Sequence, residues 1–162
     1  MQRFFIAVLA AFVMIGSLAA MSCAPNQEKT TVSETSSPSV EITTASEGIQ
    51  FVDASWAKVL EKAQKEKKLI FFDAYTSWCG PCKMLQRNVF TRKDVAEFFN
   101  ANFVNVKKDM EIGEGPMLAE KYPIEGYPSL FFLDAKGKIV TQHLGYIEAE
   151  ALINLGKRVA KK

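Results

Sequence analysis

The stretch LIFFDAYTSWCGPCK, residues 69–83, decides the fold of this chain. It opens with a continuous apolar run, residues 69–72, which is typical of a strand that is covered on both faces of a sheet. Two cysteines, Cys79 and Cys82, then enclose a Gly-Pro pair. Pro81 suits the first turn of a helix, because it has no N–H group to leave unpaired and its φ angle is preset. The stretch therefore predicts a buried strand that leads directly into a helix, with both cysteines at the junction.

The segments around this stretch alternate between helical and strand patterns. The predicted helices, the first of them capped by Asp53 or Ser55, cover residues 55–67, 82–90, 94–100, 116–122 and 147–159. The predicted strands cover residues 49–52, 69–72, 103–107, 129–133 and 138–144, and the last two are joined by a short turn into a hairpin. This order predicts one α/β domain over residues 49–162, in which helices flank a mixed central sheet.

Composition and charge exclude several classes of protein. The 162 residues are 48% hydrophobic and 23% charged, which fits one globular domain with appendages and excludes a collagen-like or wholly disordered chain. The formal net charge of +2 is too small to indicate a nucleic-acid partner. Three cysteines are too few for a disulfide-stapled mini-protein, so the domain needs an ordinary hydrophobic core.

The first 22 residues differ from the domain and predict a signal peptide. Arg3 precedes an uncharged, mostly apolar run over residues 4–21, which is typical of an export signal. The sequence Ala20-Met21-Ser22-Cys23 resembles the lipobox of bacterial lipoproteins, in which cleavage leaves a lipid-modified N-terminal cysteine, here Cys23. The alternative is an uncleaved anchor, since the run is just long enough to cross a bilayer. Both interpretations predict that the domain lies outside the cytoplasm and is attached to a membrane.

Residues 23–48 are rich in serine and threonine and hold almost no large apolar residue. Such a segment cannot bury enough apolar surface to offset its conformational entropy. We therefore expect a flexible tether between the membrane anchor and the domain.

The two cysteines of the junction suit thiol–disulfide exchange. Cys79 falls at the N-terminus of the predicted helix, where unpaired N–H groups and the helix dipole favour a thiolate, which is the attacking species. Cys82 follows one turn later and faces back toward Cys79. Two other interpretations remain open. The pair could be half of a zinc site, although zinc needs about four ligands and only Cys23 and His143 remain; or it could be an inert structural disulfide.

The stretch also resembles the active-site strand and helix start of the thioredoxin family, through the motif Trp78-Cys79-Gly80-Pro81-Cys82. The resemblance extends over residues 49–162. It implies a thioredoxin fold and a thiol–disulfide oxidoreductase whose only redox group is the cysteine pair, without metal or other cofactor. It also implies that Cys79 attacks and Cys82 resolves, with Trp78, Gly80 and Pro81 as supporting residues. The Gly80-Pro81 pair is typical of reducing members of the family.

Two further positions are matched by this resemblance. Asp73 corresponds to the family's buried carboxylate, which exchanges a proton with the resolving cysteine, and burial would raise its pKa. Pro128 corresponds to a cis-proline that faces the active site, where a substrate strand pairs with the preceding residue, here Tyr127. The alternatives are that Asp73 only caps a strand end and that Pro128 is an ordinary trans turn proline.

The sequence departs from the family pattern in three places. Tyr127 stands where small or β-branched residues are usual, so we expect it to tune substrate choice. The lysine that often lies near the buried carboxylate is replaced by Asn105 in the expected register, with Lys107 two residues further on. The acidic segment 109–115 is longer than in small thioredoxins, and we expect it to be a solvated loop. His143 is expected to be a half-exposed strand residue.

These observations together predict an exported, periplasmic, membrane-anchored thiol–disulfide oxidoreductase that is monomeric and acts mainly as a reductase of protein disulfides. Because that compartment is oxidising, the resemblance implies a transmembrane thiol-reductant donor as a partner. Two alternatives stay open: an oxidase or isomerase that uses the same cysteines, and a non-catalytic module that binds extended peptides at Tyr127 and Pro128.

Overall fold

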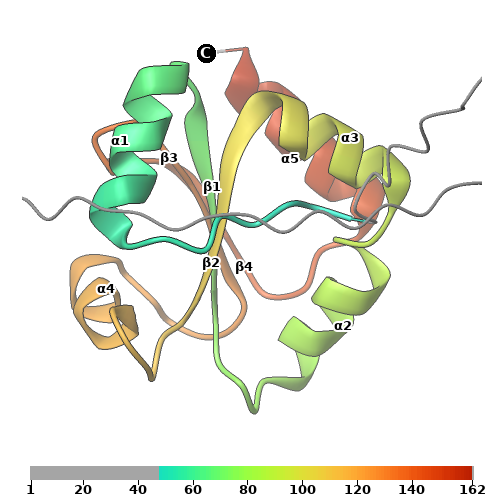
Figure 1. Cartoon of the computed structure of the whole chain (residues 1–162). Helices are drawn as coiled ribbons and strands as arrows, with labels where there is room; N and C mark the ends of the chain where they lie inside the picture. The colour runs from blue at the N-terminus through green and yellow to red at the C-terminus, as the bar shows by residue number, and fades with distance from the viewer. Residues whose placement is uncertain (1–47, 162) are drawn as a thin grey trace, which may run out of the picture. The chain divides into compact units, whose positions relative to one another are not determined.

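The computed structural model describes residues 48–161, which form a layer of β-strands between two layers of helices (Figure 1). The sheet has the strand order β2-β1-β3-β4. Strand β1 (Leu69–Tyr75) pairs in parallel with β2 (Phe103–Asp109) and antiparallel with β3 (Ser129–Leu133), and β3 pairs antiparallel with β4 (Ile139–Leu144). The predicted α/β class with a mixed sheet is confirmed.

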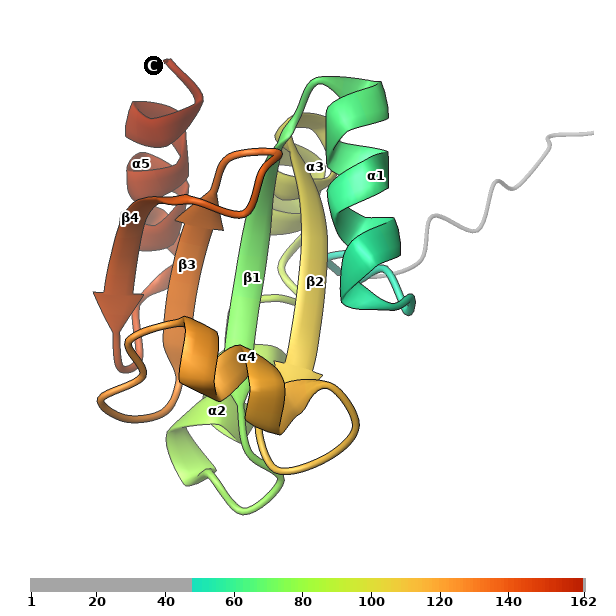
Figure 2. The same cartoon turned by 90° about the vertical axis from the view of Figure 1, so that its left-hand side faces the viewer.

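The five helices are divided between the two sides of the sheet. They are α1 (Trp56–Glu66), α2 (Gly80–Asn88), α3 (Lys93–Asn102), α4 (Gly115–Lys121) and α5 (Ala149–Ala160). Figure 1 shows α1 and α4 on one side of the sheet and α2, α3 and α5 on the other, and Figure 2 shows α1 and α4 from the front. Among residues 48–161, no helix has the length and apolar character needed to cross a membrane. The predicted signal peptide, Cys23 and residues 23–47 lie outside the described residues.

Each side of the sheet has its own hydrophobic core, because successive side chains of a strand point to opposite faces. On the side of α2, α3 and α5, Phe71 of β1 packs with its ring centroid 4.7 Å from that of Phe99. On the side of α1 and α4, the ring centroid of Phe72 lies 5.1 Å from that of Trp56. We call these sides the α2–α3–α5 face and the α1–α4 face. The run of apolar residues in β1 is therefore explained by burial on both faces.

The predicted strand over residues 49–52 is wrong. This segment forms no ladder with β2: Ile49 donates its N–H to Phe90 O at 2.7 Å, whereas Val52 donates to Asn105 O at 2.8 Å. Its two ends are thus bound to different elements, so it crosses the edge of β2 instead of extending the sheet.

The predicted N-cap position of α1 is confirmed at Ser55, but the Ser55 side chain makes no capping hydrogen bond. Instead, Trp56 N donates to both carboxylate oxygens of Glu114, at 3.0 and 2.9 Å. Lys108 Nζ contacts the same carboxylate at 3.3 Å and also donates to Ala54 O at 2.7 Å. Glu114, which we expected in a solvated loop, therefore caps a helix that begins 58 residues before it in the sequence.

Candidate active site

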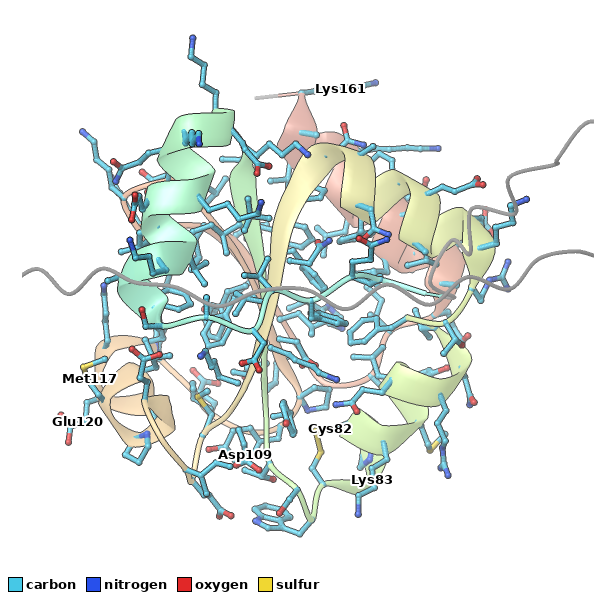
Figure 3. The ribbon with its side chains drawn as sticks, in the orientation of Figure 1. Cys82, Lys83, Asp109, Met117, Glu120 and Lys161 are labelled. Atoms are coloured by element: carbon cyan, nitrogen blue, oxygen red, sulfur yellow. A yellow bond between two sulfur atoms is a disulfide. The ribbon has the colours of Figure 1, made fainter. Side chains whose placement is uncertain are left out.

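The two cysteines form a disulfide at the N-terminus of α2, with their Cα atoms 5.3 Å apart. Cys79 is the N-cap residue, and its sulfur accepts a hydrogen bond from Cys82 N at 3.1 Å. The exposed fractions of Cys79 and Cys82 are only 3% and 1%. Figure 3 shows Cys82 at the end of the sheet where β2 finishes at Asp109. Both sulfurs are therefore largely shielded from solvent, and Cys79 is the more exposed of the two.

The helix begins at this point for local reasons. The ladder of β1 ends at Tyr75, and a turn follows in which Cys79 N donates to Thr76 O at 3.2 Å. Pro81 lies in the first turn of α2, where its missing N–H leaves no backbone partner unsatisfied. The structure thus places Gly80 and Pro81 between the sulfurs, inside the first helical turn, as the sequence predicts.

Asp73 is buried in β1, with 1% of its surface exposed. Neither carboxylate oxygen has a hydrogen-bond partner within the described part of the chain. Burial raises the pKa of Asp73 to about 7, and the positive charge of Lys107 opposes that rise. Since side chains alternate along the strand, Asp73 points to the same face as Phe71, which is the face that α2 covers through Leu85. The carboxyl group therefore lies under the helix that carries the resolving sulfur.

The lysine near Asp73 is Lys107, so the expected register with Asn105 is wrong. The parallel ladder begins with Leu69 opposite Phe103, which places Asp73 opposite Lys107 and Phe71 opposite Asn105. The Lys107 ammonium also lies 5.2 Å from the centre of the Phe51 ring. Counting from the first residue of each strand gives this pairing, so the signal was present in the sequence.

The Tyr127–Pro128 peptide bond is cis, as the resemblance implies. The Tyr127 ring meets the indole of Trp78 edge to face, with their centroids 6.0 Å apart. Trp78 immediately precedes Cys79, and 64% of its surface is exposed. The structure therefore brings the predicted supporting residue and the predicted substrate-binding residue together beside the disulfide.

Glu111 is a site residue that sequence reasoning missed. Trp78 Nε1 donates to Glu111 Oε1 at 2.9 Å, and Glu111 N donates to Asp109 Oδ1 at 3.0 Å. The acidic segment folds tightly here, since a Cβ at Gly115 would collide with the backbone of Asp109 and Met110. Glu111 is exposed, as expected for a solvated loop, but its side chain is held in place by Trp78, which was not expected. No local pattern could have revealed a contact between residues 33 apart.

Among residues 48–161, no group of three or more histidine, cysteine or acidic side chains is placed to hold a metal ion. His143 lies half-buried on β4, with Nε2 3.5 Å from Tyr146 O. Cys23, the other residue considered as a zinc ligand, lies outside the described residues. The chemistry that the described residues support is exchange at the Cys79–Cys82 disulfide.

Comparisons with known sequences agree with this geometry. Residues 56–160 match the family model of the thioredoxin-like domain. Thioredoxin H-type 2 of Nicotiana tabacum is 31% identical over 113 residues, which cover 70% of this chain and 89% of that protein. The thiol:disulfide interchange protein DsbD of Actinobacillus pleuropneumoniae serotype 5b is 30% identical over 105 residues, which cover 62% of this chain but only 18% of DsbD.

Comparisons with solved structures also find proteins of thiol–disulfide exchange. The solution structure of a candidate disulphide-isomerase from Bacteroides thetaiotaomicron is 41% identical, with a TM-score of 0.64, and the match covers 72% of this chain and 96% of that one. The oxidised C-terminal domain of DsbD from Neisseria meningitidis has a TM-score of 0.55 at 23% identity, over 67% of this chain and 97% of that domain. This second likeness shows a shared fold.

Proposed function

This chain belongs to the thioredoxin-like domain family and is a thiol–disulfide oxidoreductase, and from that premise we propose that it is an extracytoplasmic, membrane-anchored reductase of protein disulfides. The observation that carries the proposal is that the face of the sheet covered by α2 holds two buried groups: Cys82 on α2, and on β1 the Asp73 carboxyl, which has no hydrogen-bond partner among the described residues and a pKa of about 7.

In the proposed cycle, the Cys79 thiolate attacks one sulfur of a substrate disulfide. A mixed disulfide forms and the other substrate sulfur leaves as a thiolate. Asp73 accepts the proton of Cys82, and the resulting Cys82 thiolate attacks the Cys79 sulfur, which releases the second substrate sulfur as a thiolate. Two electrons pass to the substrate; its two thiolates take up one proton from Asp73 and one from solvent, the latter replacing the proton that Cys79 lost on ionisation, and the protein is left with the Cys79–Cys82 disulfide. A dithiol donor then restores the reduced pair.

The reducing direction is supported by the Gly80-Pro81 pair between the cysteines, which is typical of reducing members of the family. Burial of Cys82 and Asp73 keeps the resolving thiol protonated in the reduced protein until Asp73 accepts its proton, because burial disfavours the charged form of a thiol.

The proposed location is supported by the sequence before the domain. The apolar run over residues 4–21 and the lipobox-like Ala20-Met21-Ser22-Cys23 indicate export and lipid attachment. In an oxidising compartment a reductase needs a dithiol donor from across the membrane. The match to part of DsbD, a thiol:disulfide interchange protein, supports a donor of that kind.

A second candidate function is disulfide isomerisation. It is favoured by the 41% identity to the candidate disulphide-isomerase from Bacteroides thetaiotaomicron. An isomerase would use Cys79 in the same attack, but Cys82 would resolve the mixed disulfide less often, and the substrate would keep its oxidation state.

The reduction potential of the Cys79–Cys82 pair separates these functions. Equilibration of the full chain with dithiol buffers should give a value below about −230 mV for a reductase, on the thioredoxin side of the range. A value between about −180 and −120 mV would favour an isomerase or oxidase instead. A Cys82→Ala variant should in addition accumulate mixed disulfides with its substrates, whereas the double variant with Cys79→Ser should form none.

A further inference from the structure

The indole of Trp78 is held in an exposed position next to the reacting sulfur. Its exposed fraction of 64% makes it one of the large apolar side chains that the fold leaves uncovered. Two contacts fix it: the edge-to-face packing on Tyr127 and the hydrogen bond from Nε1 to Glu111 Oε1 at 2.9 Å. An exposed side chain that is held by two contacts loses conformational entropy without gaining the free energy of burial. Its fixed position is therefore better explained by contact with a binding partner than by the stability of the domain.

The carboxylates beside this indole lack cationic partners. Glu111 and Asp109 take part in no ion pair within the described part of the chain. Both carboxylates, with burial as the larger cause, raise the pKa of Tyr127, which places their negative charge near the Tyr127 ring. Glu114, in the same acidic segment, differs because its charge is compensated by Lys108 at 3.3 Å. Negative charge at this rim is therefore available to a partner.

One positive side chain also lies near the disulfide. Lys83 follows Cys82 on α2 and is exposed, and Figure 3 shows Asp109 and Lys83 on different sides of Cys82. The charge preference of the site is therefore the net effect of attraction by Glu111 and Asp109 and repulsion by Lys83.

We propose that Glu111 is a specificity-determining residue: it fixes the Trp78 indole against Tyr127 and presents negative charge, so that the enzyme prefers substrate disulfides flanked by cationic residues. The inference rests on the proposed function, since it names the substrate class of the same site. The flanking cation would lie near Glu111 and Asp109 while its apolar stem packs on the exposed indole, as the long aliphatic part of lysine allows.

The test compares three symmetric disulfide-linked peptide dimers, Gly-X-Cys-X-Gly, in which X is lysine, glutamine or glutamate. The reduced full chain is mixed with each dimer, and the rate of formation of free peptide thiol is measured. In each reaction one peptide disulfide is reduced to two thiols while the Cys79–Cys82 dithiol is oxidised. Because flanking charge also alters the reactivity of the peptide disulfide itself, each rate is divided by the rate with dithiothreitol.

The lysine dimer should react about threefold to tenfold faster than the glutamate dimer at low salt, with glutamine between them, as expected for solvent-exposed charges a few ångströms apart. The preference should largely disappear at about 1 M salt, where the Debye length is about 3 Å.

Three variants assign the effect to Glu111. Glu111→Gln keeps an acceptor oxygen for Trp78 Nε1 but removes the charge, so the lysine preference should fall at least about twofold while the indole N–H resonance stays in place. Glu111→Ala removes both, so the indole resonance should shift and all three dimers should react more slowly. Glu120→Gln is the matched control, because Glu120 is exposed on α4 and Figure 3 shows it pointing away from Cys82.

The outcomes separate this inference from the proposed function. If the reduced chain reduces none of the three dimers faster than a sample without protein does, the reductase function fails. If all three dimers are reduced at equal normalised rates, the function stands and the charge preference is wrong. If the preference is the same in Glu111→Gln as in the unmodified chain, Glu111 is not its determinant and the inference is overturned.

Discussion

The two faces of the sheet have cores of equal size, with thirteen buried residues each among the described residues, yet only one face carries the redox chemistry. The difference lies in how each face treats a carboxylate. On the α1–α4 face, Glu114 accepts hydrogen bonds from Trp56 N and contacts Lys108. On the α2–α3–α5 face, Asp73 has no hydrogen-bond partner among the described residues and shares its side of the sheet with Cys82.

A partnered carboxylate stabilises the fold, whereas an unpartnered buried one destabilises it and is available for proton transfer. The α1–α4 face therefore serves as a scaffold. On the α2–α3–α5 face, the buried Asp73 lowers the free energy of unfolding but is available for proton transfer. Four experiments test this division.

The largest effect is expected for Cys79→Ser. Removal of the attacking sulfur should lower the rate of disulfide reduction at least about a thousandfold, because a hydroxyl at this position is not a nucleophile in disulfide exchange. Both cores are untouched, so the free energy of unfolding should match that of the reduced unmodified chain. Reduction of a protein disulfide that continues in this variant would show that the chemistry lies elsewhere.

The next test uses a matched pair on β3, Leu130→Ala and Leu133→Ala. Both leucines are fully buried, but Leu130 belongs to the core of the α2–α3–α5 face and Leu133 to that of the α1–α4 face. Each change should lower the free energy of unfolding by about 2–5 kcal/mol, measured by urea titration. Leu130 is also the β3 partner of Asp73, so a cavity there should admit water and lower the pKa of that carboxyl.

In Leu130→Ala, the increase of the exchange rate with pH should then begin at a lower pH than in the unmodified chain. The pH profile of Leu133→Ala should stay unchanged. An equal shift in both variants would mean that the two faces are not separate in function.

Asp73→Asn tests how much the buried Asp73 carboxyl lowers the free energy of unfolding. The pKa of Asp73 is raised from 3.8 to about 7, so between these values the unfolded chain has lost a proton that the folded chain keeps. The oxidised protein should therefore lose stability as pH rises through this window, by up to about 4 kcal/mol at pH 8. The asparagine variant should lack this dependence and resolve mixed disulfides more slowly. Urea unfolding at pH 5, 6, 7 and 8 measures the first effect, and parallel pH curves for both proteins would contradict it.

The smallest effect is expected on the scaffold face. Glu114→Ala removes the cap of α1 and should lower the free energy of unfolding by about 1 kcal/mol, without change in the exchange rate. Glu120→Ala, an exposed change on the same face, should leave both quantities unaltered. A slower exchange in Glu114→Ala at unchanged stability would show that the α1–α4 face also takes part in the chemistry.

Much of this architecture could be predicted because the signals are local. The apolar run of β1, the hairpin of β3 and β4, and the Pro81 helix start are each encoded within about a dozen residues, where periodicity and turn chemistry apply. The junction with Cys79 and Cys82 follows from the same signals. The burial of Asp73 was also foreseeable, because it continues an apolar strand.

The features that could not be predicted are contacts between distant segments. Glu114 caps a helix 58 residues away, and Glu111 binds the Trp78 indole 33 residues away. Both lie in an acidic, glycine-containing stretch that has the composition of a solvated loop. The segment over residues 49–52 shows the reverse error, since its apolar residues fit a strand but its ends are held by Phe90 and Asn105 instead of a ladder.

The central place of β1 in the sheet has a consequence for folding. Its partners come later in the chain: β2 begins 34 residues after it, and the pairing of Ile70 with Leu133 spans 63 residues. Closure of such long loops is slow relative to local helix formation. A chain that ends before Leu133 has both cysteines but cannot bury β1 on both sides, so the thiols exist long before the architecture that controls them. The chain up to Cys82 therefore holds both thiols of the site, whereas the sheet that buries β1 and Asp73 beneath them is complete only once Leu133 is present.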